Sequence, residues 1–253
     1  MSFCFIHAAD LHLDVSATGI SALPENLFEQ VRDASLNAFD ALVRLTLDKE
    51  AAFLLIGGDV YEGLNRGVRG QLRFLQGIER LSAHGVPVFM VRGDADAEKQ
   101  TDHDWPAINQ WPTNLTFFDS KSVVPVPVER NGERLATVYG VSFACREEKR
   151  NLALHFKKKE ETSGLHVALL HCNLDHNNIA PGPCASCTLE QLEISGMDYW
   201  ALGHCHRHKT VVSKGTRAVY SGTLQGRGFL VEEEGPKGAV VVQATPEGIE
   251  EIS

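Results

Sequence analysis

A short apolar run followed by small residues and an aspartate occurs three times in this sequence, and it predicts the fold class. The runs span residues 2–9, 52–56 and 86–91, and they lead to Asp10, Asp59 and Asp94. Apolar runs of this length, bounded by turn residues, are typical of buried strands. The carboxyl ends of parallel strands meet at one rim of an α/β sheet, so we expect the three aspartates to lie close together.

Two segments between these runs have the periodicity of amphipathic helices. Their apolar positions recur at steps of three and four residues: Leu27, Val31, Ala34, Ala38, Leu42 and Leu45 in residues 25–49, then Val68, Leu72, Leu75 and Ile78. The alternation of strand and helix predicts an α/β fold. The length of 253 residues suits one large domain, and we expect residues 1–253 to form it.

Histidines follow three apolar runs in a similar way. Gly203-His204-Cys205-His206 comes after residues 199–202, Asp10-Leu11-His12 follows the first run, and His171 follows residues 165–170. Successive side chains of a strand point to opposite faces. We therefore expect Asp10 and His12 to point to one face, and His204 and His206 likewise to point the same way. Taken singly, each motif has an ordinary alternative, a core histidine or a turn aspartate.

Together the five strand-end motifs offer three carboxylates and four imidazoles. This mixture of oxygen and nitrogen donors suits Mn, Fe or Zn, and a carboxylate can bridge two ions. Two ions about 3.5 to 4 Å apart polarise phosphoryl oxygens and stabilise an in-line displacement. The motifs therefore predict a dinuclear metal centre.

The middle and the end of the chain read as further strands. Residues 114–118, 122–128 and 135–141 predict a second, more antiparallel sheet, and residues 209–213, 217–220 and 239–244 alternate like strands that close a sheet. Thr188-Leu189-Glu190-Gln191 has the form of a capping box and predicts the start of a short helix. The charged residues 147–161 predict solvated surface, with a nucleic-acid contact as the alternative.

Charge and cysteine content limit the function classes. A formal net charge of -9 argues against a basic surface for non-specific nucleic-acid binding. Six scattered cysteines, no signal-peptide pattern and no apolar run of about 20 residues predict a cytoplasmic protein that does not cross a membrane. Cys184 and Cys187 supply only half of a tetrahedral zinc set, so we interpret them as structural or incidental rather than as a zinc site, and we expect Cys205 in the core.

The motifs resemble those of the calcineurin-like metallophosphoesterases. The likeness is greatest to the DNA-repair exonuclease branch related to Mre11 and SbcD, and within it to the YhaO-type proteins. It covers residues 5–13, 55–61, 86–93, 169–171, 198–206, 222–227 and 235–238. The resemblance implies a sandwich of two mixed β-sheets flanked by helices, in four layers (αββα).

The resemblance also implies a ligand set. Asp10, His12, Asp59 and His206 would hold one metal ion, and Asp59 would bridge to a second ion held by Asp94, His171 and His204. Two divalent ions are implied, with Mn expected and Fe or Zn as alternatives. The loop that contains Arg227 resembles a family loop, so Arg227 is the candidate for a phosphate contact; an ordinary surface arginine is the alternative.

One motif departs from the family pattern. The family has Gly-Asn-His where this chain has Gly93-Asp94-Ala95, so the histidine that orients the phosphate and protonates the leaving group is replaced by Ala95. A general acid of this kind typically accelerates the reaction by about 10²- to 10⁴-fold. The weak substitutes are Asp96, Glu62 and His103; Glu62 stands where Mre11 has a histidine and YhaO-type proteins usually have an aspartate.

The expected activity is phosphodiester hydrolysis, with DNA ends as the substrate implied by resemblance. The alternative is a catalytically weak metal-binding homologue that serves as a DNA-end or partner-binding module. A Rad50-like or SMC-like ATPase is the partner implied by resemblance, and a homodimer is a further expectation. The chain is expected to lack the capping domain and the ATPase-docking segment of the longer relatives.

Overall fold

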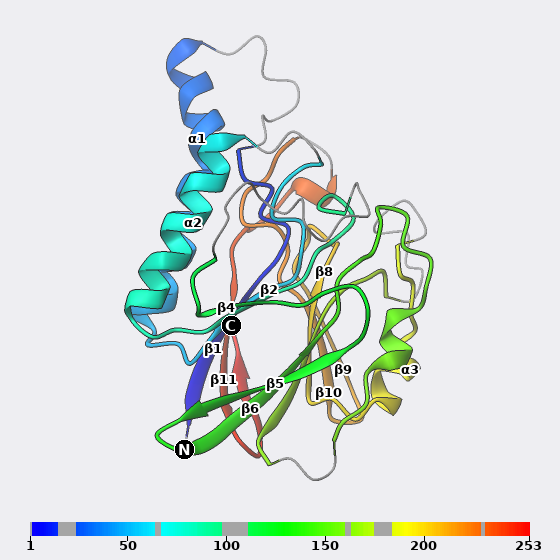
Figure 1. Ribbon diagram of the computed structural model, residues 1–253. Coiled ribbons are helices and arrows are strands. Elements are labelled where there is room, and N and C mark those ends of the chain that lie inside the picture. The colour runs from blue at the N-terminus through cyan, green and yellow to red at the C-terminus, as the bar shows by residue number, and fades with distance from the viewer. Residues whose placement is uncertain are drawn as a thin grey trace.

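Two six-stranded β-sheets pack face to face in the computed structural model, with helices on both outer sides (Figure 1). The structure describes residues 2–14, 24–63, 67–97, 111–159, 163–174, 184–228 and 231–253. The predicted sandwich of two mixed sheets is confirmed.

The first sheet has the strand order β12-β11-β1-β2-β3-β4. Its strands are β1 (Phe3–Ala8), β2 (Leu54–Ile56), β3 (Val88–Met90), β4 (Leu115–Phe117), β11 (Val240–Thr245) and β12 (Gly248–Ile252). Strands β1 to β4 run parallel, as the three apolar runs predict, while β11 pairs antiparallel with β1. All residues of β1, β2 and β3 are buried, because helices cover one face of these strands and the second sheet covers the other.

The second sheet has the order β5-β6-β7-β8-β10-β9. Its strands are β5 (Val124–Arg130), β6 (Glu133–Gly140), β7 (Leu165–His171), β8 (Tyr199–Gly203), β9 (Lys209–Ser213) and β10 (Thr216–Tyr220). The four central strands are parallel, and only the edge strands β5 and β9 pair antiparallel.

Two sequence predictions about the sheets are therefore wrong. The second sheet is not mainly antiparallel, and the strand predicted at residues 114–118 joins the first sheet as β4. Alternating apolar residues show that a strand has a buried face, but they do not show which strand it pairs with. Strand β12 was not predicted, because only one of its five residues is buried.

The helices complete the four layers. The α1 helix (Glu25–Asp48) and the α2 helix (Val68–Ala83) lie side by side on the first sheet (Figure 1). The α3 helix (Leu189–Ile194) and the short η1 helix (Leu152–His155) cover the second sheet, and η2 spans Val231–Glu233. The predicted capping box at α3 is confirmed, because Thr188 and Gln191 exchange hydrogen bonds.

Three apolar clusters fill the spaces between the layers. Phe39 and Phe74 pack the helices α1 and α2 on the first sheet, and Phe5 stacks on Phe53 at 4.7 Å between the sheets. Trp200 lies under α3 and η1, where Cys205 is buried as expected. These clusters fix the two sheets against each other, so the carboxyl ends of their parallel strands face the same region.

Candidate metal centre

The structure brings together the seven ligand candidates that the sequence predicts. Asp10 and His12 follow β1, Asp59 follows β2, and Asp94 follows β3. The other three histidines come from the second sheet. The histidines stand at the end of β7 (His171) and directly after β8 (His204 and His206). The group therefore contains acids mainly from one sheet and imidazoles mainly from the other.

Three of these side chains form a first cluster: Asp10, His12 and His206 place one ligand atom each within 4.8 Å of the others. The Nε2 atoms of His12 and His206 are 3.3 Å apart, and Asp10 Oδ1 lies 4.0 Å from His206 Nε2. Two imidazole nitrogens and a carboxylate that face one point are a donor set suited to a divalent transition metal.

A second cluster surrounds Asp94. Its Oδ1 atom lies 3.0 Å from His171 Nε2 and 3.2 Å from His204 Nδ1. Asp59 lies between the two clusters, because its Oδ2 atom is 4.0 Å from His12 Nε2 and 3.7 Å from His171 Nε2. Asp59 is thus a carboxylate with contacts to both clusters, the position that a bridging ligand requires.

Hydrogen bonds to the main chain orient several of the candidate ligands. His171 Nδ1 lies 2.9 Å from the carbonyl oxygen of Gly57, so this nitrogen donates and Nε2 faces the cluster. Asp59 Oδ1 accepts from the amide of Ala95 at 3.0 Å. Both oxygens of Asp10 accept from the amide of His204, which links the loop after β1 to the loop after β8.

An acidic residue also lies behind each histidine of the first cluster. His12 Nδ1 is 2.9 Å from Glu62 Oε2, and His206 Nδ1 is 2.6 Å from Glu233 Oε1. Arg227 joins the two glutamates: its NH1 is 2.8 Å from Glu62, and its amide donates to Glu233 Oε2. We call Glu62, Arg227 and Glu233 the carboxylate bridge. Carboxylates in this position set the tautomer and the orientation of metal-binding histidines.

The charges of the carboxylate bridge are strongly stabilised. The contact with His12 lowers the pKa of Glu62 to about 2. Burial opposes the ionisation of Glu233, but the hydrogen bond with His206 outweighs it and lowers the pKa of Glu233 to about 2. Glu233 was missed in the sequence because it lies in no recognisable motif, far along the chain from its partner. Arg227 has its charge close to two carboxylates.

Three buried groups, Asp59, Asp94 and His171, influence one another's pKa values. Among the protein groups alone, burial raises the pKa of Asp59 well above its usual range, and the nearby acids raise it further. Burial opposes the ionised form of Asp94, but the hydrogen bonds from His171 and His204 lower its pKa. Burial also disfavours charged His171, yet Asp59 and Asp94 raise its pKa to about 10. Divalent cations would supply the positive charge that these buried carboxylates need.

Four of the candidate ligands have left-handed backbone conformations. The φ angles are 52° at Asp10, 41° at His12, 52° at Asp59 and 101° at His204. The strands end before these residues, so loop conformations rather than strand alternation orient the side chains. Asp10 and His12 do meet in one cluster, as predicted, whereas the prediction that His204 and His206 point the same way is wrong. The loops instead direct His206 to the first cluster and His204 to the second.

The glycines before the ligands are needed for close approach. A Cβ atom on Gly93 would clash with Asp59 Oδ1 and stand 2.5 Å from His171 Cε1. A Cβ atom on Gly203 would clash with the carbonyl oxygen of Gly57 and stand 2.8 Å from His171 Nδ1. These distances are shorter than real Cβ contacts, so the ligands can meet only where no side chain intervenes.

The remaining candidates lie in different surroundings. Asp96 is buried and accepts hydrogen bonds from the amides of Val60 and Tyr61 at 3.1 and 3.0 Å, so it holds the loop after β2. Ala95 is also buried, and His103 lies outside the described residues. Cys184 was not expected at the centre, yet its sulfur lies within 4.8 Å of ligand atoms of Asp94 and His204. Burial, Asp94 and Asp59 raise the pKa of Cys184 to about 12.

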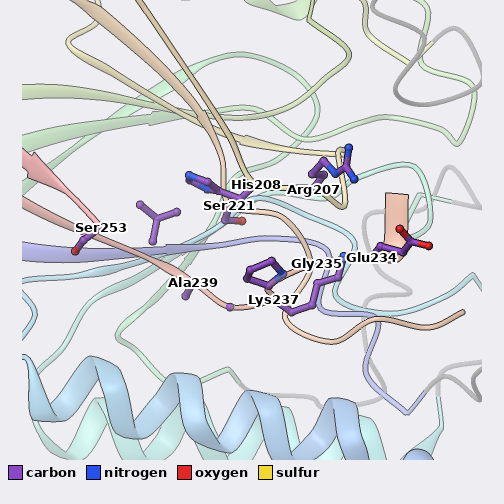
Figure 2. A pocket seen from close by; sticks show the side chains of 11 residues that line it. Arg207, His208, Ser221, Glu234, Gly235, Lys237, Ala239 and Ser253 are labelled. Carbon is purple, nitrogen blue, oxygen red and sulfur yellow. The ribbon is translucent and has the colours of Figure 1, made fainter. Parts of the chain in front are cut away.

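A pocket of about 430 Å³ is lined in part by Arg207 and His208, the two residues that follow His206. Figure 2 shows Arg207, His208 and Lys237 among the side chains that line it. Lys237 Nζ donates to the carbonyl oxygen of His206 at 3.1 Å, which attaches this pocket to the loop of a candidate ligand. The pocket lining also contains Glu234, so charged groups of both signs lie beside the loop that contains His206.

Comparisons with known proteins agree with this geometry. Residues 4–208 match the model of the calcineurin-like phosphoesterase family. The chain is similar to the metallophosphoesterase YhaO of Bacillus subtilis (strain 168), with 32% identity over 241 residues that cover 95% of the chain and 57% of YhaO. It is also similar to the SbcD component of the nuclease SbcCD of the same organism, with 23% identity over 95% of the chain and 66% of that protein.

The chain thus spans less than two thirds of the length of these curated relatives. Among solved structures, TT1561 of Thermus thermophilus has the same fold, with a TM-score of 0.53 and 11% identity over 100% of this chain and 99% of that chain. Within the described residues, no helix has the length and apolar character that a membrane span requires.

Proposed function

Because this chain belongs to the calcineurin-like phosphoesterase family, we propose that it is a dinuclear metal-dependent phosphodiesterase that acts on DNA ends. The observation that supports the dinuclear centre best is the place of Asp59, whose Oδ2 atom lies between the cluster of Asp10, His12 and His206 and the cluster around Asp94. A carboxylate with neighbours on both sides is the natural bridge between two ions.

In this proposal Asp10, His12, Asp59 and His206 hold one ion, and Asp59, Asp94, His171 and His204 hold the other. The donor set fits two divalent transition metals, and Mn is the expected metal, with Fe or Zn as alternatives. When bound, two such ions polarise phosphoryl oxygens and make a nucleophile available at neutral pH. The protein residues orient the donors, through Gly57 behind His171 and through the carboxylate bridge behind His12 and His206.

The substrate class rests on two features. The SbcD relative belongs, by its name, to a nuclease. In this chain, the pocket beside the His206 loop contains Arg207 and Lys237 along with Glu234, and these two cations are the candidates to bind a neighbouring backbone phosphate of a DNA strand. Arg227 is a weaker candidate for this contact, because it already lies against Glu62 and near Glu233. An ATPase partner of the Rad50 type, and a homodimer, remain part of the proposal by analogy.

The described surroundings of position 95 also favour a second candidate function. Ala95 cannot donate a proton to a leaving group, and its amide is bonded to Asp59. Asp96, its neighbour, is committed to the amides of Val60 and Tyr61. A protein with this site could bind metal and DNA ends and cleave them slowly, so the second candidate is a DNA-end or partner-binding module.

The free state of all six cysteines supports a location in a reducing cytoplasm.

A substrate comparison tests the enzyme proposal. We expect the Mn-loaded protein to hydrolyse bis-(p-nitrophenyl) phosphate slowly, because this substrate has a good leaving group and needs little acid assistance. We expect Ala95→His to raise the cleavage of linear DNA by roughly 10²-fold or more, and to change hydrolysis of the aryl substrate much less. Ala95→Gln, which has similar bulk and no comparable acid, is the matched control.

The outcomes separate the two functions. If Ala95→His binds two metal ions per chain but cleaves neither substrate, while the unchanged protein binds DNA ends tightly, the enzyme proposal fails and the binding module stands. If Asp59→Ala leaves the metal content at two ions per chain, the assignment of the dinuclear centre fails as well. Metal content is measured by mass spectrometry on the same samples.

A further inference from the structure

Cys184 lies at the second cluster, although no motif predicts it there. Its sulfur, a carboxylate oxygen of Asp94 and a ring nitrogen of His204 all lie within 4.8 Å of one another. The Cys184 residue is 8% exposed, so it is buried beside this cluster. The sulfur is therefore near enough to share an ion with Asp94 and His204 after a small movement of its side chain.

The backbone around Cys184 is held on both sides. The carbonyl oxygen of Cys184 accepts from the amide of Asn173 at 3.1 Å, and the amide of Ala185 donates to the carbonyl oxygen of Glu148 at 2.7 Å. A further bridge joins Leu174 to Cys187. Asn173 and Leu174 directly follow β7 and His171, so the cysteine is fixed to the same strand end that carries a candidate ligand.

A second observation concerns His204. Its side chain is 9% exposed, its Nδ1 atom contacts Asp94, and its Nε2 atom is buried with no hydrogen-bond partner among the described residues. A buried polar nitrogen without a partner is costly unless a ligand or water satisfies the ring. The second cluster thus contains an imidazole nitrogen, His204 Nε2, that has no hydrogen-bond partner among the described residues. The thiol of Cys184 lies next to this imidazole.

From these contacts we infer that the Cys184 sulfur is a ligand of the second metal position, which therefore prefers Zn²⁺ or Fe²⁺ to Mn²⁺. This inference rests on the proposed dinuclear centre and adds one donor to it. On binding, the thiol releases its proton to solvent, and the sulfur lone pair forms the bond to the metal. A thiolate beside two imidazoles selects borderline metals, whereas sites of carboxylates and water suit Mn²⁺.

The other buried thiols provide the comparison. The sulfurs of Cys172 and Cys187 are 3.7 Å apart and contact each other, and neither belongs to a group of described residues that could hold an ion. Cys187→Ser therefore removes a buried thiol three residues from Cys184 without removing a donor from the cluster. It serves as the matched control for Cys184→Ser.

Cobalt spectroscopy on the full chain tests the inference. The protein loaded with Co²⁺ should show a sulfur-to-cobalt charge-transfer band in the near ultraviolet, which Cys184→Ser and Cys184→Ala lose and Cys187→Ser keeps. The Zn²⁺ affinity of Cys184→Ser should fall by at least about 10-fold, the effect of losing even an outer-shell partner, with Mn²⁺ affinity changed much less. X-ray absorption of the unchanged Zn²⁺-loaded protein should show a sulfur neighbour at about 2.3 Å, which needs no variant.

Other results would contradict either the role of Cys184 or the dinuclear centre itself. If the chain binds two Co²⁺ ions without the charge-transfer band, or if the band survives in Cys184→Ala, the inference is wrong and the dinuclear centre stands. If the zinc spectrum shows only nitrogen and oxygen neighbours, the conclusion is the same. If the unchanged chain binds no metal, the proposed function fails together with the inference.

Discussion

The left-handed residues Asp10, His12 and Asp59 lie in two loops that are tied together beyond the ends of their strands. The amide of Asp10 donates to Gly58, that of His12 to Asp59, and that of Leu13 to Val60. Such conformations cost about 1 to 3 kcal/mol each and persist only where surrounding contacts hold them. Sequence patterns predict which residue types meet at the rim, but not these backbone angles, which arise from pairing between distant loops.

The carboxylate bridge leads to a prediction at single residues. Glu233→Gln keeps the shape of the side chain but removes the charge behind His206, so we expect the affinity of the first metal position to fall about 10- to 100-fold. Glu62→Gln, behind His12, should act in the same direction. Calorimetric titration with Mn²⁺ measures the affinity.

Glu234→Gln is the matched control for this prediction. Glu234 lines the pocket beside the cluster rather than contacting His206. If Glu233→Gln and Glu234→Gln bind Mn²⁺ equally well, the carboxylate bridge has no role in holding the metal.

His7 gives a pH prediction. It is fully buried in β1, with Nδ1 3.1 Å from the hydroxyl of Tyr199, and burial lowers its pKa to about 3. Below pH 6.5 the unfolded chain takes up a proton that folded His7 does not, so stability decreases as the pH falls. Between pH 6.5 and pH 5 this residue alone should cost roughly 2 kcal/mol of unfolding free energy, an order-of-magnitude figure.

Denaturant unfolding in a metal chelator at the two pH values measures this loss. His7→Asn can still bond to Tyr199 but does not titrate, so its stability should fall less between pH 6.5 and pH 5. Equal losses in both proteins would show that other groups carry the acid sensitivity.

At the scale of elements, the short parallel strands determine where the candidate site forms. The apolar runs of β1, β2, β3, β7 and β8 could be predicted, and so could the seven side chains that follow them. The place of β4 and the contribution of Glu233 and Cys184 could not, because each depends on which segments meet after folding. The apolar pattern of a strand does not show which strand it pairs with. A single acid or thiol, such as Glu233 or Cys184, belongs to no sequence motif that would reveal its role.

Gly93 provides the test at this scale. A Cβ atom there meets Asp59 and His171, so Gly93→Ala should push these two side chains apart and lower the metal content of the second position. We also expect a loss of about 1 to 3 kcal/mol of stability from overpacking. Gly248→Ala is the control, since a Cβ atom on Gly248 meets nothing within 4 Å. Full metal content in Gly93→Ala would contradict the account of the strand-end glycines.

At the scale of the whole molecule, the candidate ligands join two sheets whose interface is otherwise mainly apolar, with the contact between His7 and Tyr199 as a polar exception. Asp10, His12, Asp59 and Asp94 come from the first sheet, and the remaining histidines come from the second. The cluster of Phe5, Phe53 and their neighbours holds the sheets together without metal. Ions in the centre would add a link across the rim of the sandwich.

This link predicts a thermal effect of metal. At a free ion concentration 100 times the dissociation constant, binding to the folded state alone stabilises a protein by about 2.7 kcal/mol. For a chain of this size we expect Mn²⁺ or Zn²⁺ to raise the Tm by roughly 5 to 10 °C. A chelator should return the Tm to the value of the metal-free protein. Scanning calorimetry measures it, and Asp59→Ala is the control that should not respond. A Tm independent of metal in the unchanged protein would argue against ions that join the sheets.

The pairing of β1 with β11 has a consequence for synthesis on the ribosome. Residues Phe3 to His7 pair with residues 240 to 244, so β1 leaves the ribosome more than 200 residues before the strand that covers this edge. Until then β1, whose residues are all buried in the folded protein, has an open edge of the kind that recruits other strands. The first sheet is therefore completed only after residues 240–244 have left the ribosome, so the exposed edge of β1 is a site for non-native strand pairing during synthesis.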